Sequence, residues 1–392
     1  MSNVQVNKRP DVKVPPEYFS TLKPGCASFE QQLKIQPLIT SFVGQSVPYK
    51  ITTALPNVNF RLSEVYVEID IIVTFSSSDV KDTYATVQPG VVPWATSLVN
   101  ECRLLCGSTQ VSDIRQLNTI FNWQQNISSN TITRLAETYN NPTSVVYTAA
   151  TAQRFRFPLS HLGNDLWSLE NGVWPGAFVK HCDLEIYFEA PAYCLYYAGT
   201  VVGTTFSLGY SASNFNVQIV QVQDMHFDAM INMRDYIINY NEWYWYQQPV
   251  PLTATQTIQI PIAYSSVRSI VWGVQRVADL IDPTMQGKLS LMSSELTDLV
   301  TCDLRINSQL RQQDKFIGVE QMIPETRRTF PIAKFSDYYT SLALNKTTHQ
   351  MLAMLAGQSY CTSCSSGLNS QKVCIFLFFW HHPPPTHIDI HI

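Results

Sequence analysis

Charged residues are scarce in this chain. Asp, Glu, Lys and Arg make up 14% of its 392 residues, whereas about 25% is usual for a soluble protein. The formal net charge is −4, and basic residues adjoin one another only in two pairs, Lys8-Arg9 and Arg327-Arg328. A protein that coats nucleic acid needs a basic stripe to neutralise phosphates, so the composition argues against that role. A surface so poor in charge predicts contact with other protein.

Long apolar runs are also missing. The first twenty residues contain no apolar segment of the length that a secretion signal requires. The longest uninterrupted apolar stretch, Cys374 to Trp380, is far too short to cross a bilayer. We therefore expect a soluble protein made in a reducing compartment. The nine cysteines are odd in number and lack paired spacing, which favours buried free thiols over a disulfide framework.

The sequence matches no template for catalysis. GQSYC lacks the last glycine of the nucleophile elbow G-x-S-x-G, and no Walker loop or G-x-G-x-x-G occurs. Glu185 and Glu189 could suggest paired acid and base work. We interpret them instead as solvated residues on the polar face of an alternating strand. The prediction is therefore a protein without catalytic residues and without a cofactor.

Metal-ligating residue types gather near the C-terminus. Cys361 and Cys364, followed by Cys374 and His381, could form a Cys₃His zinc site. A redox role for this C-x-x-C would need a strand-to-helix context, and its loop is rich in serine. We favour no metal site, because Cys374 lies inside an apolar strand and tail histidines are more often solvated. The tail histidines are His381, His382, His387 and His391.

A period of two is the dominant pattern of the chain. In EVYVEIDIIVTF the apolar residues alternate with mainly polar ones, and alternate side chains of a strand point to opposite faces. We expect a strand over 64–75 with one buried face, and a similar strand in CDLEIYFEA with Leu184, Ile186 and Phe188 buried. The buried set of the first strand is Val65, Val67, Ile69, Ile71, Val73 and Phe75.

Two stretches that lie 200 residues apart resemble each other. CRLLCGST at 102–109 and CDLRINSQ at 302–309 share Cys, Leu and Ser at equivalent positions. Gly107 is matched by Asn307, and both residue types tolerate positive φ. Each stretch predicts a strand that runs into a tight turn. VRSIVWGVQR at 267–276 loosely repeats the pattern of the strand over 64–75. The sequence therefore predicts one structural unit that occurs twice in the chain.

Length and segment order predict two β-sandwiches. A chain of 392 residues is too long for one ordinary core. We expect an N-terminal arm over 1–28 that orders only against a partner, a first sandwich over 29–228, a second over 229–380, and a tail over 381–392. Three prolines should carry the tail out of the fold and along a surface.

Three local features refine this scheme. Val111, Ile114, Leu117 and Phe121 recur at helical spacing, which predicts an amphipathic helix. The strand over 374–380 is apolar on both faces and should lie in the interior of its domain. An aromatic cluster opens the second half, and we expect its Trp243 and Trp245 to anchor either a core or an interface. The cluster is Tyr236, Tyr240, Trp243, Tyr244, Trp245 and Tyr246.

Several segments resemble major capsid proteins with a double jelly roll. SLVNECRLLCGSTQVSDI is similar to their strand-turn-strand that leads into a helix. The segment FRFPLSHLGNDLWSLENGVWPGAFVKHCDLEIYFE, residues 155–189, is similar to their Pro-Leu element and the strand that follows. YSSVRSIVWGVQR resembles the start of their second roll. This lineage includes tailless membrane-containing phages, adenoviruses, virophages and large DNA viruses.

The resemblance implies an all-β fold of two tandem eight-stranded jelly-roll β-sandwiches with short helices in loops. It implies a viral major capsid protein, made in the host cell interior, whose pseudo-hexagonal homotrimers tile an icosahedral shell. The implied partners are its own copies, neighbouring capsomers, penton and minor capsid proteins and, in members that enclose one, an internal membrane. Specific nucleic acid is not among them.

Two rival functions are kept. The first is an adhesin or lectin, which would normally carry a secretion signal, and the second is an enzyme. Carbohydrate-active or deglycosylating enzymes can also consist of two jelly rolls. Such an enzyme would need acidic residues that meet at the junction of the two halves.

Overall fold

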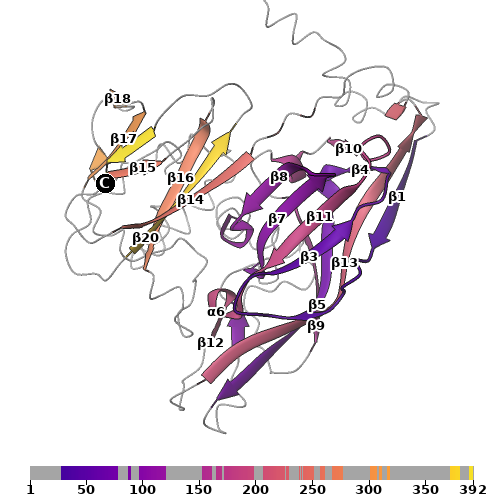
Figure 1. The fold of residues 1–392 in the computed structure, drawn as a ribbon, viewed down its shortest axis with the longest axis horizontal. Helices are drawn as coiled ribbons and strands as arrows, with labels where there is room; N and C mark the ends of the chain where they lie inside the picture. Colours follow the sequence, from indigo (N-terminus) through magenta and orange to yellow (C-terminus); the bar gives the residue numbers. More distant parts are fainter. Residues whose placement is uncertain are drawn as a thin grey trace, which may run out of the picture.

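A computed structural model of the chain shows two β-rich bodies (Figure 1). The residues described are 28–77, 87–89, 97–120, 152–160, 165–169, 172–197, 206–225, 227–228, 238, 240, 242–250, 257–260, 267–276, 301–306, 309–310, 316–317, 371–379 and 388–391. Side chains are described in the first body and as far as residue 247, and the backbone alone beyond it.

Eight strands of the first body form two facing antiparallel sheets. The first sheet runs β1 (Ser28–Ile35), β13 (Phe206–Asp224), β5 (Tyr66–Ser77) and β9 (Gln153–Pro158). The second runs β3 (Tyr49–Ala54), β11 (Cys182–Phe188), β7 (Val99–Cys106) and β8 (Thr109–Arg115). Apart from the β7–β8 hairpin, successive strands of these eight change sheet, which is the connectivity of a jelly roll.

Short elements complete the first body. Strands β2 (Phe42–Val43), β4 (Asn59–Arg61) and β10 (Val173–Pro175) extend the first sheet, and β6 (Val87–Pro89) pairs with β12 (Leu195–Tyr197). Its short helices include η1 (Leu62–Glu64), η3 (Leu166–Ser168) and α6 (Pro191–Cys194). No helix in the described part of the chain is long and apolar enough to span a membrane.

The core lies between the two sheets, and alternation explains it. The apolar face of β5 points inward, and Val67, Ile69, Ile71 and Val73 are each no more than 1% exposed. Leu184, Ile186 and Phe188 of β11 are equally buried in the facing sheet. Full burial of each such side chain is worth about 1.5–3 kcal/mol. The strands that the period of two predicts over 64–75 and in CDLEIYFEA are confirmed.

The helix expected from Val111 to Phe121 is wrong over its first half. β8 occupies Thr109–Arg115 and pairs with β7. Helical backbone is described only from Leu117 to Ile120. Ile114 points into the core, whereas Val111, on the other face of β8, is only partly buried. A strand with apolar residues on both faces imitates the spacing of a helix.

The second body repeats the plan of the first. Its strands are β14 (Glu242–Val250), β15 (Thr257–Ile260), β16 (Val267–Arg276), β17 (Thr301–Ile306), β18 (Gln309–Leu310), β19 (Phe316–Ile317), β20 (Gln371–Phe379) and β21 (Ile388–His391). The order β14-β20-β16 corresponds to β1-β13-β5, and the order β15-β21-β17-β18 corresponds to β3-β11-β7-β8. Two jelly rolls therefore follow each other in one chain.

The repeated sequence pattern marks the same hairpin in the two bodies. Cys106 pairs with Thr109 at the end of β7, and Ile306 pairs with Gln309 at the end of β17, so each loop contains two residues. Gly107 has a φ of 61°, as tight two-residue hairpin loops require. The expected strand-and-turn is thus confirmed at 102–109, and the equivalent strand pairing is present at 302–310.

The tail departs from its expected course. Residues Ile388–His391 form β21, which pairs with both β15 and β17 inside a sheet. The expectation that the tail leaves the fold is therefore wrong for these residues. Two isoleucines in IDIH alternate with polar residues, a strand signal that the three preceding prolines obscured. β20 lies between β14 and β16 in a sheet, and the expectation that it is buried on both faces stays a prediction.

Candidate interface surfaces

Most of the predicted metal ligands lie outside the described residues. These are Cys361, Cys364, His381, His382 and His387. Cys374 lies within β20, and His391 is the last residue of β21. In the described part of the chain, no three His, Cys, Asp or Glu residues gather as a metal ion would require. The absence of a zinc site stays a prediction.

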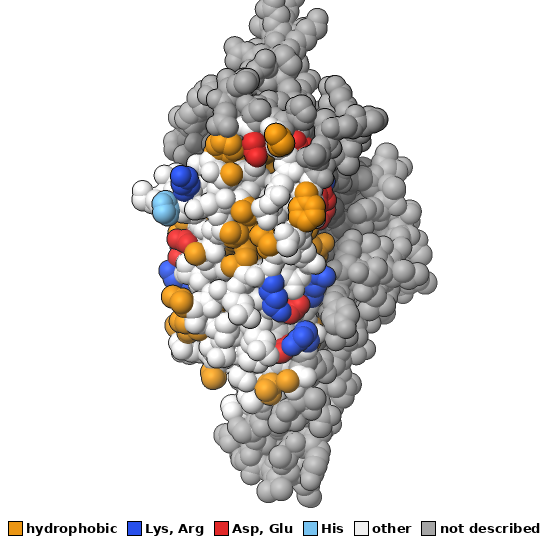
Figure 2. Space-filling model, turned by 90° about the vertical axis from the view of Figure 1, so that its right-hand side faces the viewer, with side chains coloured by type: hydrophobic (Ala, Val, Ile, Leu, Met, Phe, Trp, Pro, Cys, Tyr) orange, Lys and Arg blue, Asp and Glu red, His pale blue; other side chains and the backbone are white. Residues whose placement is uncertain are grey.

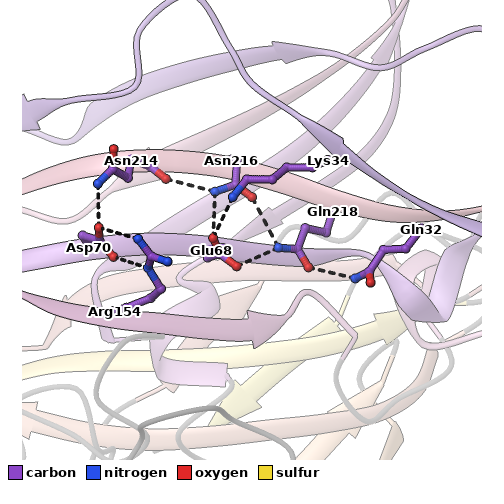
Figure 3. A network of polar contacts seen from close by, with 8 residues as sticks. All are labelled: Gln32, Lys34, Glu68, Asp70, Arg154, Asn214, Asn216 and Gln218. Atoms are coloured by element: carbon purple, nitrogen blue, oxygen red, sulfur yellow. Dashed lines mark hydrogen bonds and ion pairs between the residues drawn. The ribbon is translucent and has the colours of Figure 1, made fainter.

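The outer face of the first sheet carries a closed network of polar side chains (Figure 3). Arg154 binds Asp70 through two hydrogen bonds, of 2.8 Å from Nε and 3.1 Å from Nη2. Asn214 donates a third to the same carboxylate at 2.6 Å. The hydrogen bonds from Arg154 lower the pKa of Asp70, and this effect is larger than the opposing effect of burial. This carboxylate is therefore ionised and fully engaged.

The same network continues across Glu68 to the edge of the sheet. Lys34 binds Glu68 at 2.9 Å, and Gln218 donates to its other oxygen at 2.7 Å. Gln32 then donates to Gln218 at 2.9 Å. Although burial opposes ionisation of Glu68, the hydrogen bonds from Lys34, Asn216 and Gln218 together lower its pKa. Charges of both signs cancel within the network, so this face presents little net charge to a ligand.

A second chain of contacts crosses the outer face of the other sheet. Lys50 binds Glu185 at 2.7 Å, and the Tyr187 hydroxyl donates to the other oxygen of Glu185 at 3.1 Å. Arg103 donates to Tyr187 at 3.1 Å. The chain of contacts thus links β3, β11 and β7.

Two carboxylates meet where this second chain reaches β8. Glu101 and Asp113 lie on paired strands with Arg103 and Arg115 between them, and Arg115 binds Asp113 at 3.1 Å. Burial, and after it the Asp113 carboxyl, raise the pKa of Glu101 to about 7 despite Arg103. An acid pair of this kind is what a two-roll enzyme would need, but here both carboxylates are bound by arginines of the same sheet.

Glu185 and Glu189, expected on a solvated face, are both buried. Glu185 is ion-paired on the outer face of β11. Glu189 follows β11, is 5% exposed, and accepts hydrogen bonds from Asn118 Nδ2 at 3.2 Å and Ala190 N at 3.0 Å. Burial raises the pKa of Glu189. The interpretation of both residues as solvated is therefore wrong.

The start of the second roll packs against the first. β14 contacts β8, and Trp243 is 5% exposed within the core cluster of the first body. The Tyr240 hydroxyl donates to the backbone oxygen of Val111 in β8, and both residues pack against the core cluster. Trp245 packs against the same cluster and is only partly buried. Of the two tryptophans, Trp243 is the core anchor, which confirms the first of the two expected roles.

A short apolar strip lies exposed beside β2. Leu38, Ile39, Val43 and Val47 fall within ten residues of sequence, and each exposes half or more of its surface. Single exposed apolar residues are ordinary, but grouped ones mark contacts with other protein. Figure 2, which views the molecule from the right-hand side of Figure 1, shows hydrophobic side chains interspersed with a few charged ones. We call these four residues the β2 strip.

The comparisons with known proteins reveal likeness in structure only. The sequence matches no family model and no curated protein. The Faustovirus major capsid protein is similar with a TM-score of 0.53 and 10% identity, over 95% of this chain and 90% of that one. The PBCV-1 virus capsid has a TM-score of 0.49 and 10% identity, over 95% of this chain and 94% of that one. The mavirus major capsid protein has a TM-score of 0.46 and 9% identity, over 95% of this chain and 86% of that one.

The likeness to the Faustovirus protein covers 95% of this chain and so extends over both bodies, whose strand order is that of two successive jelly rolls. Together they establish the expected fold class: an all-β double jelly roll, with short helices in its connections.

Proposed function

We propose that this chain is a viral major capsid protein that works as a homotrimer in the shell of a virion. The observation that carries the proposal is the repetition of one jelly roll, down to the same hairpin pairing, within a single chain. The Faustovirus protein that shares this fold is a major capsid protein.

Repetition explains how such a chain could tile a surface. Two similar rolls in each of three chains make six nearly equivalent lobes around a threefold axis. Such a trimer has a pseudo-hexagonal outline and packs hexagonally. The contact between chains is heterologous, first roll against second roll, and it stays finite because its rotation closes. The partners of the trimer would be neighbouring capsomers, penton and minor capsid proteins and, where the particle encloses one, a membrane.

The β2 strip is the surface that we assign to the contact between chains. Its apolar side chains are exposed in the single chain, and permanent interfaces between subunits bury such residues. The outer face of the first sheet is less suited, because its polar groups already satisfy one another. A role in virus assembly would place the finished protein in the virion.

A carbohydrate-active enzyme is the rival function, and Glu101 and Asp113 are the residues it would use. Their arginine partners argue against it, since a general acid has to reach a substrate oxygen. Incubation with glycan substrates tests the rival directly. Turnover by the wild type that is lost in the Asp113→Asn variant would favour the enzyme.

Native mass measurement tests the proposed trimer. The single chain weighs 44.5 kDa, so the proposal predicts a dominant species of three times that mass, formed without any substrate. The Leu38→Glu/Val43→Glu double variant should shift the population to monomers, whereas Met225→Glu, at an exposed apolar residue outside the strip, should leave the trimer intact. A stable monomer or an even-numbered oligomer of the wild type would contradict the proposal.

A further inference from the structure

Two thiols face each other across neighbouring strands of the first roll. Cys106 ends β7 and Cys182 begins β11, and the register pairs them directly. Their sulfur atoms lie 3.1 Å apart. Both are free cysteines; Cys182 is buried and Cys106 is partly exposed.

The backbone explains why the two sulfurs lie so close. The carbonyl of Cys182 accepts from Leu55 N at 2.8 Å, on the β3 side, so it is not turned toward β7. The next pair outward is hydrogen-bonded, with Gly107 N donating to His181 O at 2.9 Å. Cys106 and Cys182 therefore form a non-hydrogen-bonded pair, the type in which opposite Cα atoms approach to about 4.5 Å and side chains come closest.

This geometry suits a disulfide with little rearrangement. Bridged cysteines have Cα atoms about 4.4–6.8 Å apart, and the two sulfurs need only approach by about 1 Å to reach bonding distance. Cys102, which is also buried in β7, differs because its register partners are Ile186 and Ile114. Among the described cysteines, the pair at 106 and 182 alone is placed for bridging.

We infer that Cys106 and Cys182 are a redox-modification site that closes to an intramolecular disulfide on contact with a small-molecule disulfide such as oxidised glutathione. The inference concerns the fold of the first roll and does not depend on the proposed function. It would let a protein made with free thiols acquire a covalent cross-link once it meets oxidising conditions.

The reaction consists of two thiol–disulfide exchanges. The partly exposed Cys106, as thiolate, attacks one sulfur of the small disulfide, which forms a mixed disulfide and releases one small thiolate. The Cys182 thiolate then attacks Cys106 Sγ and releases the second. The two protein protons pass to the released thiolates, so two protein thiols are oxidised and one small disulfide is reduced to two thiols.

The environment of Cys106 sets the pace of this reaction. Burial, and after it the neighbouring Cys182, raise the pKa of Cys106 to about 12. Only the thiolate attacks, so closure should be slow at neutral pH. Its rate should rise about tenfold for each unit of pH below the pKa. The closed bridge would join strands separated by 76 residues of chain, and such a loop restricts the unfolded state.

Peptide mapping of the folded, fully reduced full-length chain after incubation with oxidised glutathione tests the inference. Remaining thiols are alkylated in denaturant before digestion. We expect a cross-linked peptide containing Cys106 and Cys182, with a higher melting temperature than the reduced protein. The Cys106→Ala and Cys182→Ala variants should lose both effects, whereas Cys194→Ala, which removes another buried thiol, should retain them.

The wild-type map is decisive even where a variant fails to fold. Free Cys106 and Cys182 after prolonged incubation would overturn the inference. So would a stable glutathione adduct on Cys106, or a bridge from Cys106 to a different cysteine.

Discussion

Replacing Glu101 by Gln should stabilise the protein at pH 8 and change little at pH 5. The side chain of Glu101 is 15% exposed and lies on the outer face of β7. Burial first, and Asp113 second, raise its pKa from 4.5 to about 7. An acid with a raised pKa binds its proton more tightly in the folded state. Its contribution to stability is therefore full below about pH 4.5 and is lost as the pH rises through about 7.

The size of the effect follows from that shift. One pKa unit corresponds to about 1.4 kcal/mol, so the difference between 4.5 and 7 sets an upper limit of about 3.5 kcal/mol. Coupling to Asp113 and screening by solvent reduce the effect, and we expect a gain of about 1–2 kcal/mol at pH 8. Gln has the shape of the protonated acid and cannot ionise, so it removes the cost that Glu101 incurs.

Urea unfolding at pH 5, 6, 7 and 8, at one protein concentration, measures the effect. The quantity of interest is the difference in free energy of unfolding between Glu101→Gln and wild type, which should grow as the pH rises. Glu64→Gln, which removes the same charge from an exposed side chain of η1, controls for net charge. A variant less stable than wild type at pH 8 would show that the ion pairs with Arg103 and Arg115 outweigh burial, and would refute the reasoning.

Three further changes test the fold by urea or thermal unfolding. Trp243→Ala should cost about 3–5 kcal/mol because Trp243 is buried in the core, and a cost no greater than that of Trp245→Ala would remove its role as anchor. Leu104→Ala, at a fully buried residue, should cost about 2–5 kcal/mol, and a near-neutral result would contradict the packing of β7. Since the pKa of Asp70 is lowered, its contribution to stability is lost as the pH falls through that pKa. Wild type should therefore lose more stability than Arg154→Ala between pH 5 and pH 3, and equal losses would refute the role of the network.

The alternating strands could be predicted because one physical cause decides them. β5 and β11 each have one face in the core, so burial alone explains their sequence. The hairpin after β7 was predictable for a similar reason, since its turn needs a residue that tolerates positive φ, and Gly107 has that conformation. These local signals also revealed the repetition of the roll.

Features that depend on distant segments could not be predicted from the sequence. β8 was mistaken for a helix because Val111 packs against the core cluster from the outer face, together with Tyr240, which lies 129 residues further along the chain. Glu189 is buried and accepts a hydrogen bond from Asn118, which belongs to another element of the fold. Pairing of Cys106 with Cys182 requires the register of β7 against β11, which spacing in the sequence does not reveal. β21 was missed because its partners β15 and β17 lie far from it in the chain.

Electron microscopy of the purified protein would show directly whether the chain assembles as a capsid protein. We expect particles with a hexagonal outline, six similar lobes and threefold symmetry, which associate into closed shells without any substrate. Isolated two-lobed particles that never associate, under conditions in which the protein is folded, would contradict it.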